Sequence, residues 1–200
     1  MYLARLRLNR SRMAVTWSAN PYRVHQRLAM AFSQRDPRLL FRLEDTPQGT
    51  QILVQSQRMP DWGRAFTDLE VLSTPPECKS LELHLEGAHR YRFRLLANPC
   101  VKRNEKRLGL LREDQQRAWL ARKLGEAGAE LVACRASPQG HMKSRKNPVK
   151  DEASQTHWAV LFEGILLARD PRRLGEAVAS GVGPAKGYGF GLLSLAPLMS

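Results

Sequence analysis

The stretch Gly181-Val-Gly-Pro-Ala-Lys-Gly-Tyr-Gly-Phe-Gly191 places five glycines within eleven residues, with one lysine and two aromatic residues between them. Glycine accepts a positive φ without a steric penalty and lets the backbone approach a ligand closely. Free N–H groups in such a loop form a concavity that holds phosphate, and Lys186 would add a point charge there. The stretch therefore predicts a phosphate-binding loop. The alternative is a flexible turn before a last strand.

Two common phosphate-binding motifs do not match this stretch. The P-loop pattern has a lysine directly after its last glycine, but Tyr188 follows Gly187. The dinucleotide-binding pattern has its third glycine where Lys186 stands, and it follows a strand and opens a helix. Here a helix-like segment precedes the glycines and the strand-like Leu192–Leu195 follows them. Both motifs are therefore excluded.

Hydrophobic periodicity divides the chain into two halves with the same order of elements. Tyr2–Leu8 and His89–Ala97 alternate apolar with basic residues, as strands with one buried face do. Each half fits the order β-α-β-β-α-β, the ferredoxin-like arrangement that also underlies RNA-binding RRM domains. We therefore predict an α+β fold of two tandem ferredoxin-like (RRM-like) domains. The expected boundaries are 1–73 for the first domain, 74–88 for a linker region and 89–200 for the second domain. The remaining strands are expected at Leu39–Glu44, Gln51–Gln57, Ala129–Ala136, Thr156–Leu167 and Leu192–Leu195.

The first helix has the clearest start signal in the chain. Asn20-Pro21 places asparagine at the N-cap and proline at the first helical position. An apolar stripe with a period of four follows, and Asp36-Pro37 is expected to end the helix. The stripe consists of Val24, Leu28 and Phe32. Asn9–Ser18, which precedes the start signal, is polar and is predicted to be a loop.

Later helices are expected at three places. Asp61–Leu69 is a short candidate, and Asp170-Pro171 repeats the N-cap and proline signal to open the last helix. Glu113–Gly125 is amphipathic, with Gly125 or Gly128 as its stop. Its expected buried side is formed by Ala118, Leu120, Ala121 and Leu124.

Composition favours a polyanionic partner. The 200 residues carry 32 Lys and Arg against 19 Asp and Glu, a net charge of +13, which attracts nucleic acid first and an anionic membrane surface second. No apolar stretch approaches the roughly 18 residues of a membrane span, and we expect no signal peptide. Three widely spaced cysteines without a C-x-x-C pair predict reduced thiols in the cytoplasm. Zinc is not expected, since the histidines do not cluster at ligand spacing, and neither is any cofactor.

Tyr22 and His25 are the residues best placed for catalysis. They lie three apart at the start of the first helix and so share a face beside its free N–H groups and positive dipole end. A phosphate bound there would meet an imidazole, the commonest general acid or base, together with a phenol. The alternative is that both are packing residues, because His25 lies near the edge of the apolar stripe.

Two groups of cations add a second functional signal. Tight groups of lysine and arginine suit contacts along a nucleic-acid backbone, although each group alone also suits a solvated loop. Because Tyr91-Arg-Phe93-Arg lacks the glycines of the RRM signature, we expect a basic groove for structured RNA and no stacking of single strands on a sheet. The groups are Lys102, Arg103, Lys106 and Arg107, then Lys143, Arg145, Lys146 and Lys150.

Four motifs in order resemble the CasE family, the endoribonucleases that process CRISPR RNA in type I-E Cascade. The resemblance runs over the whole chain and is specific because the spacing is compatible throughout. The motifs are Asn20-Pro-Tyr-Arg-Val-His-Gln-Arg-Leu28, Tyr91-Arg-Phe-Arg-Leu-Leu-Ala-Asn-Pro99, Ala159-Val-Leu-Phe-Glu-Gly164 and Gly181–Ser194 with its glycine-rich loop.

The resemblance implies tandem ferredoxin-like domains and a metal-free cut on the 3′ side of the CRISPR repeat hairpin. The 2′-hydroxyl attacks the adjacent phosphate and leaves 2′,3′-cyclic phosphate and 5′-hydroxyl ends. His25, Tyr22 and Lys186 match the family's catalytic histidine, active-site tyrosine and loop lysine. The family's basic hairpin, which enters the RNA major groove, corresponds to 136–150, and loop N–H groups near Gly183 and Gly187 would contact RNA. The implied partners are the repeat hairpin RNA and other type I-E Cascade subunits, with no membrane.

Two alternatives remain open at this point. The chain could be an assembly subunit that binds structured RNA without cutting it. It could also be a basic module like those of ribosomal proteins, which would explain the charge but neither the glycine loop nor the Tyr22–His25 pair.

Overall fold

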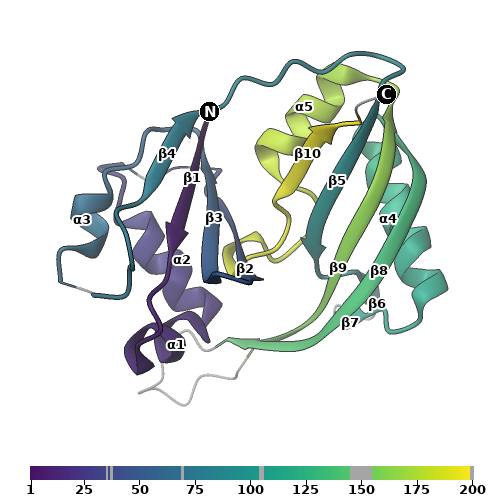
Figure 1. Ribbon diagram of the computed structural model, residues 1–200. Helices are drawn as coiled ribbons and strands as arrows, with labels where there is room; N and C mark the ends of the chain where they lie inside the picture. Colours follow the sequence, from purple (N-terminus) through teal and green to yellow (C-terminus); the bar gives the residue numbers. More distant parts are fainter. Residues whose placement is uncertain (35, 37, 69, 104–105, 145–154, 199–200) are drawn as a thin grey trace. The chain divides into compact units, whose positions relative to one another are not determined.

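The computed structural model describes residues 1–200 except 35, 37, 69, 104–105, 145–154 and 199–200. The chain forms two compact units (Figure 1). The first contains 1–82, 143–155 and 186–189, and the second contains 83–142, 156–185 and 190–200. Each is built on a four-stranded antiparallel sheet. The α+β prediction is confirmed.

The first unit has the ferredoxin-like strand order β2-β3-β1-β4 (Figure 1). In the register, Leu6 of the central strand β1 lies opposite Ile52 of β3. Its elements are β1 (Tyr2–Arg7), α1 (Arg12–Ser18), α2 (Pro21–Ala29), β2 (Leu40–Thr46), β3 (Gly49–Ser56), α3 (Trp62–Phe66) and β4 (Glu77–Ser80). The predicted domain boundaries stay a prediction. Within the predicted linker region, β4 pairs antiparallel with β1.

Buried and exposed side chains alternate along β1, so one face of this sheet lies against the core. Ala4 and Leu6 are buried with Ile52 of β3, and α2 contributes Val24 and Leu28, one turn apart, to the same cluster. A fully buried leucine contributes roughly 1.5–3 kcal/mol. The predicted apolar stripe of α2 therefore holds the helix, and its N-terminal turn, against the sheet.

Two local predictions in this unit are wrong. Asn9–Ser18 is not a loop, because α1 begins at Arg12 with Ser11 as N-cap, and the Ser11 hydroxyl accepts a hydrogen bond from the Ala14 N–H at 3.1 Å. The basic residues of this stretch conceal the burial of Trp17, whose ring meets Phe66 edge-on. Helix α2 ends at Ala29, well before Asp36. Asp36 lies beyond the helix and accepts hydrogen bonds from the backbone N–H groups of Arg38, Gln57 and Arg58.

The second unit repeats the topology, with strand order β10-β5-β9-β8 (Figure 1). A hairpin that the sequence did not predict, β6–β7, is inserted after β5. The elements are β5 (Arg90–Ala97), β6 (Cys100–Arg103), β7 (Lys106–Gly109), α4 (Glu113–Glu126), β8 (Ala129–Ser144), β9 (Gln155–Ala168), α5 (Pro171–Ser180) and β10 (Leu193–Pro197). The last two residues of β8, the first of β9 and the 3-10 helix η1 (Lys186–Tyr188) belong to the first unit.

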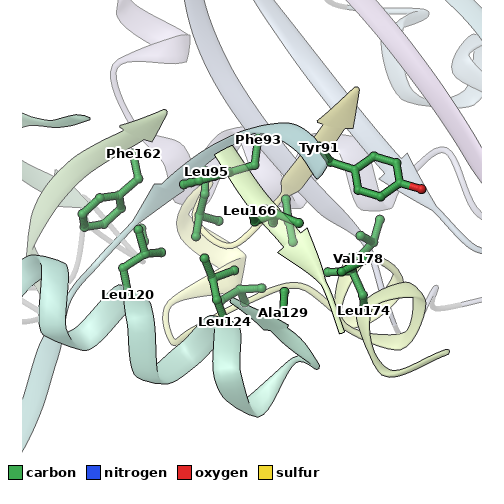
Figure 2. Packing of buried hydrophobic residues seen from close by; sticks show 14 of the residues in the cluster. Tyr91, Phe93, Leu95, Leu120, Leu124, Ala129, Phe162, Leu166, Leu174 and Val178 are labelled. Carbon is green, nitrogen blue, oxygen red and sulfur yellow. The ribbon is translucent and has the colours of Figure 1, made fainter. Parts of the chain in front are cut away.

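The core of the second unit lies between its sheet and α4 and α5. Figure 2 shows Leu95 and Leu166 of the sheet facing Leu120 and Leu124 of α4. The predicted alternation of β5 is confirmed, since Tyr91, Phe93 and Leu95 are buried. The predicted face of α4 is wrong in part. Ala118 and Ala121 are exposed. Trp119 and Gln116 are buried instead. The Trp119 ring stacks on Phe162, and the Gln116 amide donates hydrogen bonds to the carbonyls of Leu110 and Leu111.

Among the described residues, no helix has the length and apolar character needed to cross a membrane.

Candidate active site

The N-terminus of α2 is the centre of the site. Asn20 is the N-cap, and its Oδ1 accepts a hydrogen bond from the Tyr22 N–H at 3.2 Å. Such a cap is worth about 1 kcal/mol, and Pro21 fits the first position because no N–H is needed there. The first turn, all of it described, carries no acidic residue. The positive end of the helix dipole is therefore not neutralised by the helix itself, which favours a bound anion.

The structure places Tyr22 and His25 one turn apart on α2, as the sequence predicts. Both side chains are half-buried, so each is held in place while part of it remains accessible. The His25 ring lies 6.1 Å from the ring of Phe41 on β2, measured between centroids. Phe41 is fully buried, so it is a rigid support for the imidazole.

The glycine stretch meets α2 through η1. This short helix packs against α2 and β2, all within the first unit. A Cβ placed on Gly187 would lie 3.9 Å from both Nε2 and Cδ2 of His25, so the loop backbone runs beside that edge of the imidazole. Gly189 has a φ of +87°, and a Cβ there would lie 3.2 Å from Phe41. Glycine is needed at 189 for both reasons.

Two further loop side chains belong to this group. The Tyr188 ring lies 6.0 Å from that of Tyr22, tilted by 31°. Burial raises the pKa of Tyr188, and Tyr22 raises it further, so this phenol keeps its proton. Burial lowers the pKa of Lys186, and the positive charge of Arg38 lowers it further. Positive charge is therefore concentrated where an anion would offset it.

The structure brings together four predicted site residues in the first unit: Tyr22, His25, Lys186 and Gly187. Gly183 belongs to the second unit. There it has a φ of +84°, and an added Cβ would lie 3.0 Å from Trp119, so both the backbone conformation and the packing require glycine at this position.

The predicted cationic groups are spread over both units. Lys102, Arg103 and Arg107 are exposed on the β6–β7 hairpin, and the backbone of Lys106 is part of β7. Lys143 is exposed near the end of β8 in the first unit. The other members of its group, Arg145, Lys146 and Lys150, lie outside the described residues.

Sequence reasoning missed Ser144, the residue after Lys143. It is buried at the end of β8, and its hydroxyl accepts a hydrogen bond from the Tyr22 N–H at 3.2 Å. A serine in a basic, polar segment gives no local signal of such a contact. Tyr188 was visible within the glycine stretch but was not among the predicted site residues.

The other histidines have different surroundings. His157 Nδ1 lies 3.1 Å from the side-chain nitrogen of Asn98, and burial, followed by the charge of Arg107, lowers its pKa. The ring of His141 meets Trp158 edge-on at 4.9 Å. Within the described part of the chain, no three His, Cys, Asp or Glu side chains lie close enough together to hold a metal ion. The chemistry that the α2 site offers is acid–base transfer by His25 and charge stabilisation by Lys186 and the helix start.

Comparisons with known proteins all find similarity to CRISPR-associated proteins over nearly the whole chain. A family model described as "CRISPR associated protein" matches residues 1–197. The chain is 36% identical over 215 residues to the CRISPR-associated endoribonuclease Cse3 of Thermus thermophilus, covering 98% of this chain and 100% of that protein. It is 35% identical over 221 residues to the CRISPR system Cascade subunit CasE of Escherichia coli, covering 99% and 100%.

A solved structure agrees with these relatives. Thermus thermophilus Cse3 bound to an RNA representing a pre-cleavage complex is 34% identical and superimposes with a TM-score of 0.83, covering 98% of each chain.

Proposed function

Since the chain belongs to the CRISPR-associated protein family, and within it to the Cse3/CasE endoribonucleases, we propose that it binds the hairpin of a CRISPR repeat and cuts the precursor RNA on the 3′ side of that hairpin. The observation that carries the proposal is the grouping of Tyr22, His25 and the Lys186 loop around one helix start, in a chain similar to Cse3 over nearly its full length.

The cut is a transesterification that consumes no water. The 2′-oxygen forms a bond to the adjacent phosphorus while the bond to the 5′-oxygen breaks, which leaves a 2′,3′-cyclic phosphate and a 5′-hydroxyl. One proton leaves the 2′-hydroxyl and one is added to the 5′-oxygen. His25 transfers one of these protons, since imidazole titrates near neutral pH. Tyr22 orients the phosphate, and Lys186 with the loop N–H groups stabilises the charge that develops on it.

Hairpin binding is assigned to the two cationic groups and to loop N–H groups. Lys102, Arg103 and Arg107 are exposed, so no burial of their charge opposes contact with phosphate. Lys143, which precedes Arg145 and Lys146 in the sequence, is exposed as well. Contacts of this kind follow the phosphate backbone and give salt-dependent affinity. We assign Lys106, Lys150, Gly183 and Gly187 to the same RNA contact.

Association with other type I-E Cascade subunits belongs to the same proposal, because the relative CasE is a Cascade subunit. We place the protein in the cytoplasm. A reducing compartment suits Cys78, Cys100 and Cys134, which are all free thiols. Burial raises the pKa of each of these thiols, so they remain protonated and weakly reactive.

The decisive experiment incubates the protein in EDTA with a repeat hairpin RNA that has a 3′ extension. We expect one cut at the 3′ base of the hairpin, with a cyclic phosphate on the upstream product. A second RNA with a single 2′-deoxy nucleotide at the cut site should stay intact, because it lacks the attacking hydroxyl. An RNA that is tightly bound but uncut would support the non-catalytic alternative. Cleavage only when a divalent metal is added would contradict the metal-free route.

The binding surface is tested by the salt dependence of hairpin affinity. Replacing Lys143, Arg145 and Lys146 by alanine should weaken binding and reduce the slope of log K against log[salt] by about one for each phosphate that is no longer neutralised. The control removes the same charge by alanine at Arg117, Arg122 and Arg172, which are exposed on α4 and α5. An equal fall in slope in both triple variants would remove the β8 end from the binding surface.

A further inference from the structure

The proposed cleavage step leaves one side chain of the α2 site, Tyr188, without a task. Its ring lies 6.0 Å from the ring of Tyr22, measured between centroids, and the two planes are tilted by 31°. Both residues belong to the first unit, and both side chains are half-buried. The two phenols therefore lie side by side, and part of each remains accessible.

The backbone around η1 gives Tyr188 a fixed place. The residues that flank this short helix both have a left-handed backbone conformation, with φ of +63° at Ala185 and +87° at Gly189. An alanine seldom adopts that conformation, and residues held in it cluster at active sites and ligand clamps. The Gly189 N–H donates to the Lys186 carbonyl at 3.2 Å and closes the turn. These constraints define the conformation of the turn that carries Tyr188.

This turn of η1 meets one turn of α2. The backbone at Gly187 runs beside the His25 imidazole, and the next residue, Tyr188, places its ring beside Tyr22. Tyr22 and His25 lie three residues apart in the first turns of α2. The Tyr188 phenol is therefore part of the same contact as the imidazole, at a helix start that favours a bound anion.

The Tyr188 hydroxyl is suited to donate a hydrogen bond to that anion. Burial, followed by Tyr22, raises its pKa, so the phenol is protonated and neutral at neutral pH. Tyr22 acts on this pKa through charge, which means that the two hydroxyl ends lie close enough to interact. A neutral donor in a partly buried place can stabilise charge that develops on a phosphate, and it avoids the cost of burying a charge.

We propose that Tyr188 is a second catalytic tyrosine, whose hydroxyl donates a hydrogen bond to the scissile phosphate beside the hydroxyl of Tyr22. The proposal rests on the proposed function, because it assigns this donor to the cleavage step. Tyr188 keeps its proton throughout and takes part in neither proton transfer. Since two donors that share one phosphate compensate for each other, loss of one hydroxyl should cost little and loss of both should cost much more.

The first test is a double-mutant cycle in single-turnover cleavage, with the enzyme in excess over the RNA. Tyr22→Phe and Tyr188→Phe each keep the ring and remove one hydroxyl, and each should cleave roughly threefold more slowly. The double variant should be roughly 10²- to 10³-fold slower, as removal of a charge-stabilising donor is, and so slower than the product of the single losses. Losses that simply multiply, or a double variant no slower than Tyr22→Phe, would overturn the proposal.

Two further variants separate the hydroxyl from packing and from general damage. Tyr2→Phe is the matched control, because Tyr2 is a half-buried tyrosine of the same unit, on β1, and should cleave at the parent rate. An equal fall in Tyr2→Phe and Tyr188→Phe would overturn the proposal in favour of general destabilisation. Slow cleavage by Tyr188→Leu, with no effect of Tyr188→Phe even in the Tyr22→Phe background, would overturn it in favour of ring packing. Loss of a limb of the pH–rate profile in Tyr188→Phe would overturn it in favour of proton transfer.

A binding measurement tests the phosphate contact without using cleavage. Two hairpin RNAs that end at the expected cut site are compared, one with a 2′,3′-cyclic phosphate and one with a 3′-hydroxyl. The parent protein should bind the cyclic phosphate RNA several-fold more tightly, and this preference should persist in each single variant and disappear in the double variant. Absence of the preference in the parent, or an equal preference in Tyr22→Phe and the double variant, would overturn the proposal even if cleavage is normal. A preference that disappears only in the double variant, in a parent that does not cut, would support the phosphate contact and reject the endonuclease activity, so the two failures are distinct.

Discussion

Helices α2 and α4 follow the first strand of their respective sheets and take equivalent places in the two repeats, but their first turns carry opposite chemistry. Helix α4 begins with Glu113 and Asp114 and has no side-chain cap hydrogen bond at Arg112. Acids at this position compensate the helix dipole and stabilise the helix by roughly 0.3–1 kcal/mol each. Helix α2 relies on Asn20 and Pro21 and has Arg23 in its first turn.

The difference separates a helix start that stabilises itself from one that is suited to an external anion. At α4 the negative charge that the dipole favours is supplied by the chain. At α2 the first turn, which the structure describes in full, carries no acidic residue, and Tyr22, His25 and the Lys186 loop lie beside it. Two copies of one topology therefore differ in the charge and capping of an equivalent helix start, and our proposal assigns the cleavage site to the α2 copy. The predictions on His25, Lys186 and Arg23 test this difference, and a last one concerns a histidine of the second unit. They follow in order of decreasing effect.

Removal of the imidazole should have the largest effect. His25→Ala should slow single-turnover cleavage by roughly 10²- to 10⁴-fold, the usual contribution of acid–base catalysis. Hairpin affinity should change little, because cations supply most of the binding energy. The control is His89→Ala, an exposed histidine of the second unit that pairs with Glu86. Near-normal cleavage by a folded, RNA-bound His25→Ala protein would remove His25 from the mechanism and direct attention to Lys186 and Tyr188.

Lys186 should contribute to rate while opposing stability. Lys186→Met should slow cleavage by about 10²-fold, as loss of one charge-stabilising group does. Because burial lowers the pKa of Lys186, the unfolded chain binds more protons than the folded chain between the folded value and the ordinary 10.5. The charged lysine therefore disfavours folding at neutral pH, and this penalty is relieved as the pH rises through that window.

The corresponding measurement is urea unfolding of Lys186→Met at pH 7 beside the exposed-site control Lys79→Met. We expect Lys186→Met to be at least as stable as the parent protein, while Lys79→Met neither cleaves more slowly nor changes stability. A less stable Lys186→Met protein would mean that the lysine is retained for structure.

The substitution Arg23→Glu gives the first turn of α2 an acidic residue, as the first turn of α4 has. Arg23 is exposed in that turn. A carboxylate there should favour the helix but repel the phosphate, and we expect cleavage to slow roughly tenfold, equivalent to about 1.4 kcal/mol. Arg172→Glu makes the same change of charge in the first turn of α5 and serves as the control. Equal rates for both variants would show that the charge of the α2 start is unimportant.

The smallest effect concerns His157 in the second unit. Burial first, and then Arg107, lowers its pKa below the ordinary 6.5. As the pH falls from about 6.5 toward the folded value, the unfolded chain binds more protons, so stability is lost in this window. His157→Gln should therefore lose less stability than the parent between pH 7 and pH 5, measured by urea midpoints. His89→Gln is the exposed control, and an identical pH dependence of all three proteins would contradict the prediction.

Local chemistry was enough to predict much of the fold. The Asn20-Pro21 and Asp170-Pro171 starts are correct because capping depends on neighbours in sequence. The faces of β5 are correct because alternation has a period of two. The predicted structure was wrong where the local sequence signal was weak and tertiary packing determined the conformation. In the basic stretch before Asn20, burial of Trp17 stabilises a helix that was not predicted. In α4, the polar residue Gln116 occupies a core position that apolar residues were expected to fill.

The sequence by itself determined the ferredoxin-like order of elements, the excess of positive charge, and the three-residue spacing that places Tyr22 and His25 on one helix face. Those properties depend on periodicity and composition, which are local. Only the tertiary structure placed the backbone of Gly187 beside the His25 imidazole, Tyr188 beside Tyr22, and Ser144 on Asn20. These contacts join residues far apart in sequence, so they depend on how strands and helices pack, and no local pattern encodes them.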